Sequence, residues 1–73
     1  MASRHEIREY ESHDGRRRMQ VYETGFEVRF KIADERVYPT MFGWAESFEE
    51  AVRFAMRTYG TAWHRVEVTR IGW

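Results

Sequence analysis

The chain has no cysteine, one proline (Pro39) and no long apolar run. Disulfides are therefore excluded, and the lack of cysteine fits a reducing compartment. No stretch approaches the roughly 20 apolar residues of a membrane span. The charged segment Met1 to Tyr10 also lacks the apolar stretch of a signal peptide. We therefore expect a soluble cytoplasmic protein that does not contact a membrane.

An excess of one charge sign is also missing, because twelve Lys and Arg residues balance twelve Asp and Glu residues. A non-specific nucleic-acid binder normally carries a clear basic excess, so the overall charge gives that class no support. Lys31 is the only lysine, so eleven of the twelve cations are arginine. Arginine favours planar, bidentate or stacked contacts, although a GC-rich genome also enriches it.

Seventy-three residues are enough for one domain, residues 1–73, with a thin margin of stability. Small domains without disulfides or metals compensate by dense packing or by self-association. Aromatic residues make up 16% of the chain. They supply large buried areas in cores and are enriched at the energetic centres of interfaces.

The pair Asp14-Gly15 is the clearest turn signal, because it suits the type I′ turn of a two-residue hairpin. This turn would place Glu11 opposite Arg18 and Tyr10 opposite Met19, which are favourable cross-strand pairs. The shared apolar face then consists of Tyr10, Met19 and Val21.

Residues 26–32 alternate strictly between apolar and charged side chains, which predicts a strand with one buried face. The inward residues are Phe26, Val28, Phe30 and Ile32. Gly25 marks a bulge or tight turn before this strand, where the apolar phase slips by one residue.

A turn at Asp34-Glu35 would place Ile32 opposite Val37 and Val28 opposite Met41. Because Pro39 cannot donate to a ladder, the strand over residues 37–42 is expected at a sheet edge.

Ser47 and Glu50 form a capping box, so a helix begins at Phe48 and ends before Gly60. Its apolar stripe consists of Phe48, Ala51, Val52, Ala55, Met56 and Tyr59. Phe54 falls on the charged side and is expected to be exposed. A last strand is predicted from Trp63 to Ile71. The order of elements predicts an α+β fold, a four- to five-stranded antiparallel sheet with a single helix packed on one face.

No group of residues has the spacing of a catalytic or metal site. His5 and His64 would become neighbours if the first and last strands pair, but no third ligand accompanies them. Ser47 is explained as a helix cap, and Glu46 and Glu49 complement the helix dipole. We expect a protein that is not an enzyme and binds no metal or cofactor.

Arg16, Arg17 and Arg18 form the only cationic run and follow the hairpin turn directly. A protruding cationic tip can contact phosphate, as in β-ribbon DNA readers. The other interpretation is a solvated turn that protects a strand edge. Glu9 and Glu11 lie opposite and cancel much of the field, which favours the second interpretation.

The outward face of the predicted sheet is the strongest candidate for a binding surface. A sheet face left open to solvent is normally polar, whereas this one alternates aromatic residues with charges, as recognition surfaces do. The candidate partner-binding residues are Tyr22, Arg29, Lys31, Tyr38, Phe42, Trp63 and Arg65. The alternative is a different register, in which some of these aromatic side chains lie in the core.

The order of strands and helix, with Ser47-Phe48-Glu49-Glu50-Ala51-Val52 leading into residues 66–71, resembles the small phage-encoded anti-CRISPR proteins. Many such inhibitors are acidic DNA mimics, and the zero net charge departs from that pattern. The resemblance therefore implies an inhibitor that occludes a protein surface, and it assigns no residue.

Two functions follow from these observations. The first is a protein-interaction module, a phage or mobile-element inhibitor that binds a host complex in the host cytoplasm. The alternative is a small nucleic-acid-binding regulator that uses the tip formed by Arg16, Arg17 and Arg18. A homodimer is also expected if the chain covers its own apolar patch, with a seam at Tyr38, Phe42, Trp63 and Ile71.

Overall fold

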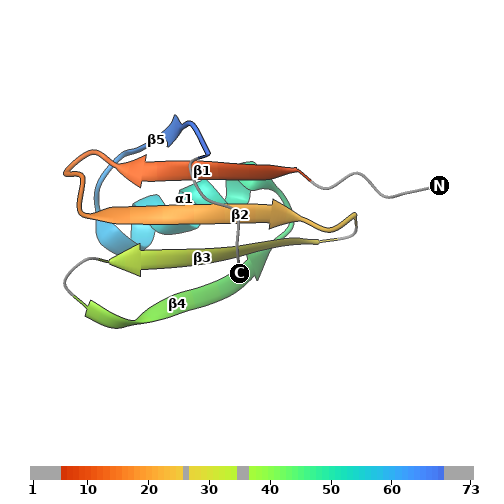
Figure 1. The fold of residues 1–73 in the computed structure, drawn as a ribbon, viewed down its shortest axis with the longest axis horizontal. Coiled ribbons are helices and arrows are strands. Elements are labelled where there is room, and N and C mark those ends of the chain that lie inside the picture. Colours follow the sequence, from red (N-terminus) through yellow and green to blue (C-terminus); the bar gives the residue numbers. More distant parts are fainter. Residues whose placement is uncertain (1–5, 26, 35–36, 69–73) are drawn as a thin grey trace.

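A computed structural model describes residues 6–25, 27–34 and 37–68, with the backbone alone for residues 37–40. It confirms the α+β fold: a five-stranded antiparallel sheet carries one helix on one face (Figure 1). The strand order is β4-β3-β2-β1-β5, so β4 and β5 are the two edges. No helix in the described part of the chain is long and apolar enough to cross a membrane. The elements are β1 (Ile7–Ser12), β2 (Arg17–Glu23), β3 (Val28–Asp34), β4 (Val37–Ala45), α1 (Phe48–Tyr59) and β5 (Trp63–Val66).

The first hairpin has the predicted register but not the predicted turn. Tyr10 lies opposite Met19, and Glu11 lies opposite Arg18. Of the turn residues only Gly15 has a positive φ, of 76°, so the turn is not type I′, which requires positive φ at Asp14 as well. The Gly15 amide instead donates to the Ser12 carbonyl at 2.9 Å, which closes a four-residue turn.

The connection between β2 and β3 is a tight turn at Gly25, which has a φ of 105°. The Thr24 amide and hydroxyl both donate to the carbonyl of Glu27, at 3.0 and 3.1 Å. Val21 then lies opposite Phe30, so the turn restores the inward face as expected. Phe26, predicted on this face, lies outside the described residues.

The predicted register between β3 and β4 is wrong by four residues. Ile32 lies opposite Met41 rather than Val37, and Val28 lies opposite Ala45. The register shifts between Ile32 and Asp34, so β4 holds extra residues before Met41. Because the error is an even number, the side chains of the last part of β4 still point to the predicted faces. β4 is an edge, as Pro39 predicts.

The ends of α1 are as predicted. The Ser47 hydroxyl accepts the Glu50 amide at 3.1 Å, and Glu50 Oε1 accepts the amide of Glu46. Gly60 has a φ of 66°, and its amide donates to the Met56 carbonyl. These contacts satisfy backbone groups that a helix leaves unpaired at its ends.

The stripe of α1 is rotated from the predicted one. Met56 is 40% exposed, whereas Phe54 is half-buried, with its ring centroid 5.3 Å from that of Phe30. Both predictions for these residues were wrong, because the inward arc centres on the fully buried Ala51 and Ala55. These small residues let the helix approach the sheet closely. The buried apolar core consists of Tyr10, Met19, Val21, Val28, Phe30, Ile32, Ala45, Ala51, Ala55 and Trp63.

Candidate protein-binding surface

The face of the sheet opposite α1 carries aromatic and cationic side chains in cross-strand rows. One row runs from Trp44 in β4 through Arg29 in β3 to Tyr22 in β2. The next row runs from Phe42 to Lys31. The structure thus brings four of the predicted residues, Tyr22, Arg29, Lys31 and Phe42, to one part of the outer face. Ile71 and the side chain of Tyr38 lie outside the part of the chain that the structure describes.

The β4 end of these rows is exposed. Phe42 and Trp44 are 65% and 69% exposed, and Met41, which points to the helix side of the same strand, is 37% exposed. Arg29 donates to Glu27 at 2.8 Å, but both side chains are open to water, so this ion pair contributes little. We refer to Met41, Phe42 and Trp44, with Arg29 and Lys31 beside them, as the edge patch.

Trp44 was missed by the sequence interpretation, which ended this strand at Phe42. β4 continues to Ala45, and Trp44 follows Phe42 at the two-residue period of a strand. That period was the available signal.

Trp63 does not lie on the outer face, so its predicted place in the binding surface was wrong. It lies opposite Ser12 in β1, is 8% exposed and packs against Tyr59 of α1 with ring centroids 6.0 Å apart. Its Nε1 is buried with no hydrogen-bond partner among the described residues. Trp63 is a core residue. The sequence left this outcome open, since a different register would place some of the aromatic side chains in the core.

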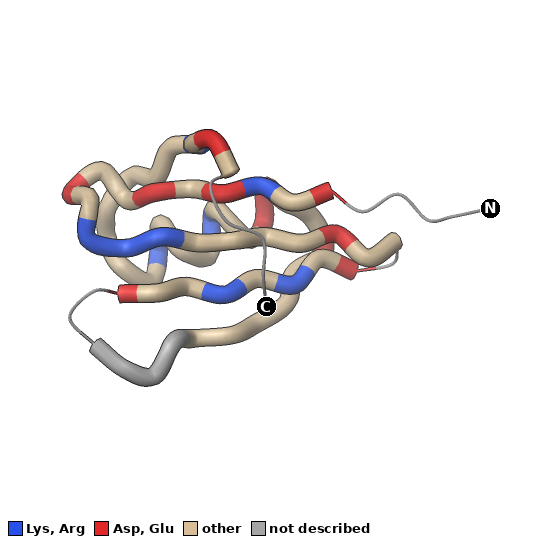
Figure 2. The backbone as a smooth tube through the Cα atoms, in the orientation of Figure 1, with Lys and Arg blue, Asp and Glu red and all other residues tan. Residues whose placement is uncertain are grey.

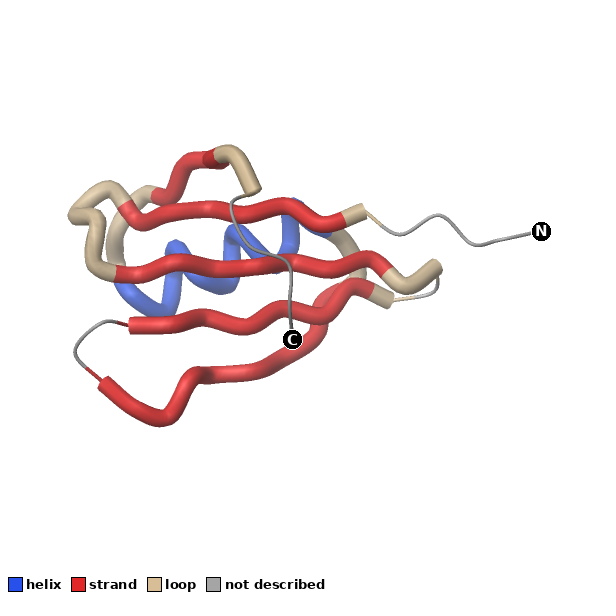
Figure 3. The backbone as a smooth tube through the Cα atoms, in the orientation of Figure 1, coloured by secondary structure: helices blue, strands red, loops and turns tan. Residues whose placement is uncertain are grey.

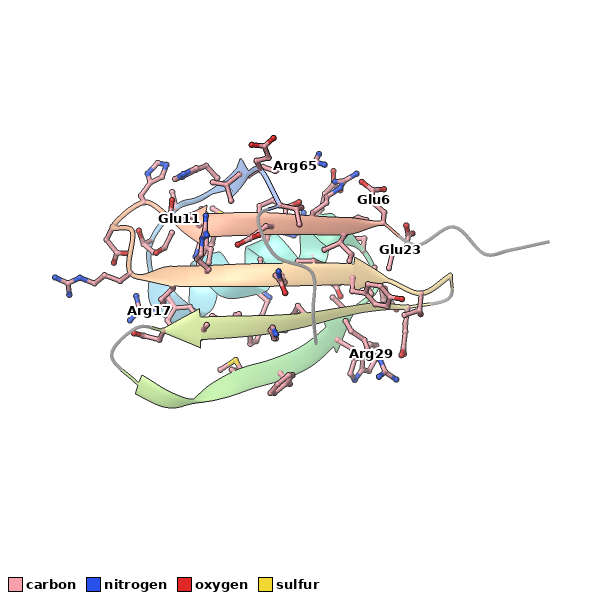
Figure 4. All side chains as sticks on the ribbon, viewed as in Figure 1. Glu6, Glu11, Arg17, Glu23, Arg29 and Arg65 are labelled. Carbon is pink, nitrogen blue, oxygen red and sulfur yellow. The ribbon has the colours of Figure 1, made fainter. Side chains whose placement is uncertain are left out.

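Arg65 also lies on the helix side, since it faces Tyr10 across β1 and β5. Its guanidinium is 3.8 Å from Glu6, which also accepts Arg8 Nε at 2.7 Å (Figure 4). The hydrogen bonds to Glu6 and then to Tyr10 raise the pKa of Arg8, whose guanidinium stacks on Phe48 at 4.1 Å. Arg65 therefore belongs to an ion-pair cluster at the far edge, away from the edge patch.

Two of the three arginines at the hairpin tip are engaged within the protein. Arg17 donates to Asp34 at 2.7 Å and stacks on Tyr59 at 4.4 Å, which ties β2 to β3 and α1. Arg18 lies 3.2 Å from Glu9, a buried carboxylate on the outer face. Arg16 is exposed. The guanidiniums of Arg17 and Arg18 thus neutralise carboxylates, which leaves little excess charge for phosphate.

The charges of the outer face are divided between its two halves. Figure 2 shows cations along β3 and at the start of β2, whereas β1 carries mainly carboxylates. Glu9 and Gln20, at the centre of this face, are 3% and 7% exposed. The β1 half is therefore occupied by paired groups, and the large aromatic side chains that are exposed among the described residues lie in the β4 half.

The histidines and carboxylates of the described residues do not form a metal site. No three His, Asp or Glu side chains among them are grouped as metal ligands would be. His64 lies 3.7 Å from Glu11 and 5.2 Å, between ring centroids, from His13. His5, the predicted neighbour of His64, lies outside the described range.

Comparison with known proteins adds no assignment. No family model matches the chain, and no curated protein and no solved structure resembles it significantly.

Proposed function

We propose that the protein is a non-enzymatic interaction module that uses the edge patch to bind a surface of another protein. The observation that carries this proposal is the exposure of Phe42 and Trp44 side by side on an edge strand. Aromatic residues supply most of the binding energy in many interfaces, because each removes a large apolar area from water when a partner covers it.

Arg29 and Lys31 support the proposal, because they stand directly beside these aromatic side chains on β3. A partner that covers Phe42 and Trp44 must approach both cations. Cations around an aromatic centre steer a partner of opposite charge and fix its orientation more than they add affinity. The partner surface is therefore expected to be apolar with acidic groups around it.

The role that fits is an inhibitor from a phage or mobile element that occludes a host protein complex, such as a defence complex. A domain of this size has room for one such surface and no catalytic group has been identified among its described residues, so it would act by covering a site. The predicted seam for a second copy included Phe42 and Trp63. Trp63 is buried, so a second copy would have to use the edge patch around Phe42.

The test is capture of a partner from a bacterial host lysate, read by mass spectrometry, with wild type and two variants. Phe42→Glu places a charge at the centre of the edge patch, and Arg65→Gln changes an exposed arginine of the far edge. We expect wild type and Arg65→Gln to retain the same protein, and Phe42→Glu to lose it while its circular dichroism stays unchanged. Equal capture by all three, or no capture at micromolar bait, would contradict the proposal.

A further inference from the structure

A groove runs along the outer edge of β4, between this strand and α1. It has a volume of about 520 Å³ and is open to solvent. Its lining residues from the sheet include Phe30, Met41, Gly43 and Ala45, and those from the helix are Glu50, Arg53, Phe54 and Arg57. The groove therefore has an apolar floor, and its rim on the helix carries two arginines and one glutamate.

The edge of β4 beside this groove has none of the features that usually protect an edge strand. Natural edges carry charged residues, prolines or bulges that prevent pairing with another chain. Residues 41–45 read Met-Phe-Gly-Trp-Ala, and both Pro39 and the irregular register precede them. Among the described residues no strand lies beyond β4. The opposite edge, β5, is only four residues long and carries His64 and Arg65.

The spacing of the two arginines matches that of side chains on an added strand. Arg53 and Arg57 are four residues apart on α1, which is about 6 Å along the helix. Alternate side chains of a strand are about 6.7 Å apart on one face. α1 runs back behind the sheet, opposite in direction to β4 (Figure 3). Since both arginines line the groove beside β4, this spacing allows side chains at positions i and i+2 of an added strand to lie next to the two guanidiniums.

An added strand would point its other side chains to the outer face, where they meet Phe42 and Trp44. Its helix-facing side chains should be acidic, because they meet Arg53 and Arg57. Its outward side chains should be apolar, because the neighbouring residues of β4 are the exposed aromatic pair. The chemistry of the two faces thus specifies an alternation of acidic and apolar residues.

We propose, building on the function proposed above, that β4 binds an extended segment of another protein as a sixth strand, in which acidic and apolar residues alternate. The main-chain hydrogen bonds supply affinity, and the alternate side chains supply specificity. A second copy of this chain fits less well. Antiparallel pairing of two β4 strands keeps both helices on one face, so Arg53 and Arg57 of both copies would flank the same seam with like charge.

The test uses three synthetic peptides and isotope-labelled protein. The first peptide alternates glutamate and valine, the second has lysine in place of glutamate, and the third is the first with N-methyl groups along one backbone edge. The measurements are affinity and the amide exchange of residues 41–45. We expect the acidic peptide to bind and to slow this exchange. The lysine and N-methyl peptides should bind at least about tenfold more weakly, since they lack the charge pairs or the strand pairing.

Variants of the protein test the two arginines. Arg53→Gln and Arg57→Gln should each lower the affinity for the acidic peptide by about tenfold. Arg65→Gln should leave this affinity unchanged. No binding of the acidic peptide at millimolar concentration, or equal binding of its N-methyl form, would overturn strand addition. Tighter binding of a single-stranded oligonucleotide than of the acidic peptide, lost in the same two variants, would overturn it in favour of a nucleic acid.

Failure of this inference is distinguishable from failure of the proposed function. If Phe42→Glu loses a captured partner that the Arg53→Gln, Arg57→Gln double variant retains, and amide exchange in residues 41–45 is unaffected, the partner docks on the outer face without adding a strand. The interaction module then stands, and strand addition is wrong. If Phe42→Glu and the double variant both retain the partner, both proposals fail.

Discussion

The hydroxyl of Ser12 is fully buried at the end of β1, where it organises the first hairpin. It donates to Asp14 Oδ1 at 2.6 Å and accepts the amide of Arg17 at 3.1 Å. The same carboxylate oxygen accepts the Arg16 amide at 3.0 Å. These contacts hold Asp14 in an ordinary conformation, which is why the turn is not the type I′ turn that Asp14-Gly15 predicts.

The Ser12 hydroxyl and the Arg16 amide lower the pKa of Asp14 below 3.8. Asp14 therefore stabilises the hairpin above the unfolded pKa, and this contribution is lost as the pH falls through the folded pKa. In Ser12→Ala the pKa of Asp14 should rise toward 3.8. The partly buried Arg17 amide also loses its acceptor, which should cost about 1 kcal/mol of unfolding free energy. NMR titration of the carboxyl group and urea unfolding measure the two effects.

His13→Ala is the matched control, because His13 is an exposed residue of the same turn. It should leave both the pKa of Asp14 and the unfolding free energy near their wild-type values. An unchanged pKa of Asp14 in Ser12→Ala would show that the hydroxyl is not what stabilises the carboxylate.

Within β4, the close approach of the strand to the core explains why residue 43 is a glycine. A Cβ at this position would lie 2.5 Å from Cζ of Phe30, whose ring is buried and packs on Phe54. The ring therefore occupies the space beside β4 that a side chain would need. Gly43 lets the strand pass over Phe30 and keeps the floor of the groove free.

Gly43→Ala should destabilise the protein by about 1–3 kcal/mol, because the added methyl overpacks a ring that has little room to move. Phe30→Leu replaces that ring with a smaller side chain and should partly restore the loss in the double variant. Urea unfolding of the four proteins in a double-mutant cycle measures the coupling. Met41→Ala controls for other changes in β4. Additive effects of the two substitutions would show that they do not meet.

The sequence predicts the elements whose signals are local. The caps of α1 at Ser47 and Gly60 are confirmed, because each cap uses neighbouring residues only. The register of the first hairpin is confirmed, because complementary pairs reinforce one alignment. The register of β3 and β4 is not predictable this way, since the extra residues before Met41 leave no compositional signal.

The candidate surface is predictable only in part for the same reason. Phe42, Lys31 and Arg29 follow from alternation along long strands. Trp63 begins a strand of four residues, which is too short for alternation to show which face is buried. Its packing on Tyr59 depends on where the helix ends in space, a tertiary fact that no local pattern contains.

At the scale of the whole molecule, one helix covers one face of the sheet, and the other face differs between its two halves. Carboxylates along β1 are paired with cations such as Arg18. Exposed aromatic residues gather at β4, with Arg29, Lys31, Arg53 and Arg57 around them. The chain as a whole is neutral, yet the cations around the exposed apolar residues of β4 outnumber the two carboxylates described there, Glu27 and Glu50. These cations would attract an acidic partner, whereas a second copy of the chain would bring the same cations to the interface.

Self-association is therefore expected to be weak, and the free protein should be a monomer at hundreds of micromolar. A standard interface buries about 800 Å² on each partner, whereas the edge patch offers three exposed apolar side chains. Two copies paired along β4 would also bring Arg53 and Arg57 of both chains to the same seam. Light scattering over a concentration series measures the mass. Phe42→Glu should stay folded and monomeric, because Phe42 is 65% exposed and adds little to the core. A dimeric wild type that Phe42→Glu dissociates would mean that a second copy occupies the edge patch, which would contradict its selectivity for an acidic strand. Unfolding of Phe42→Glu would instead place Phe42 in the core, against the register of β4 with β3.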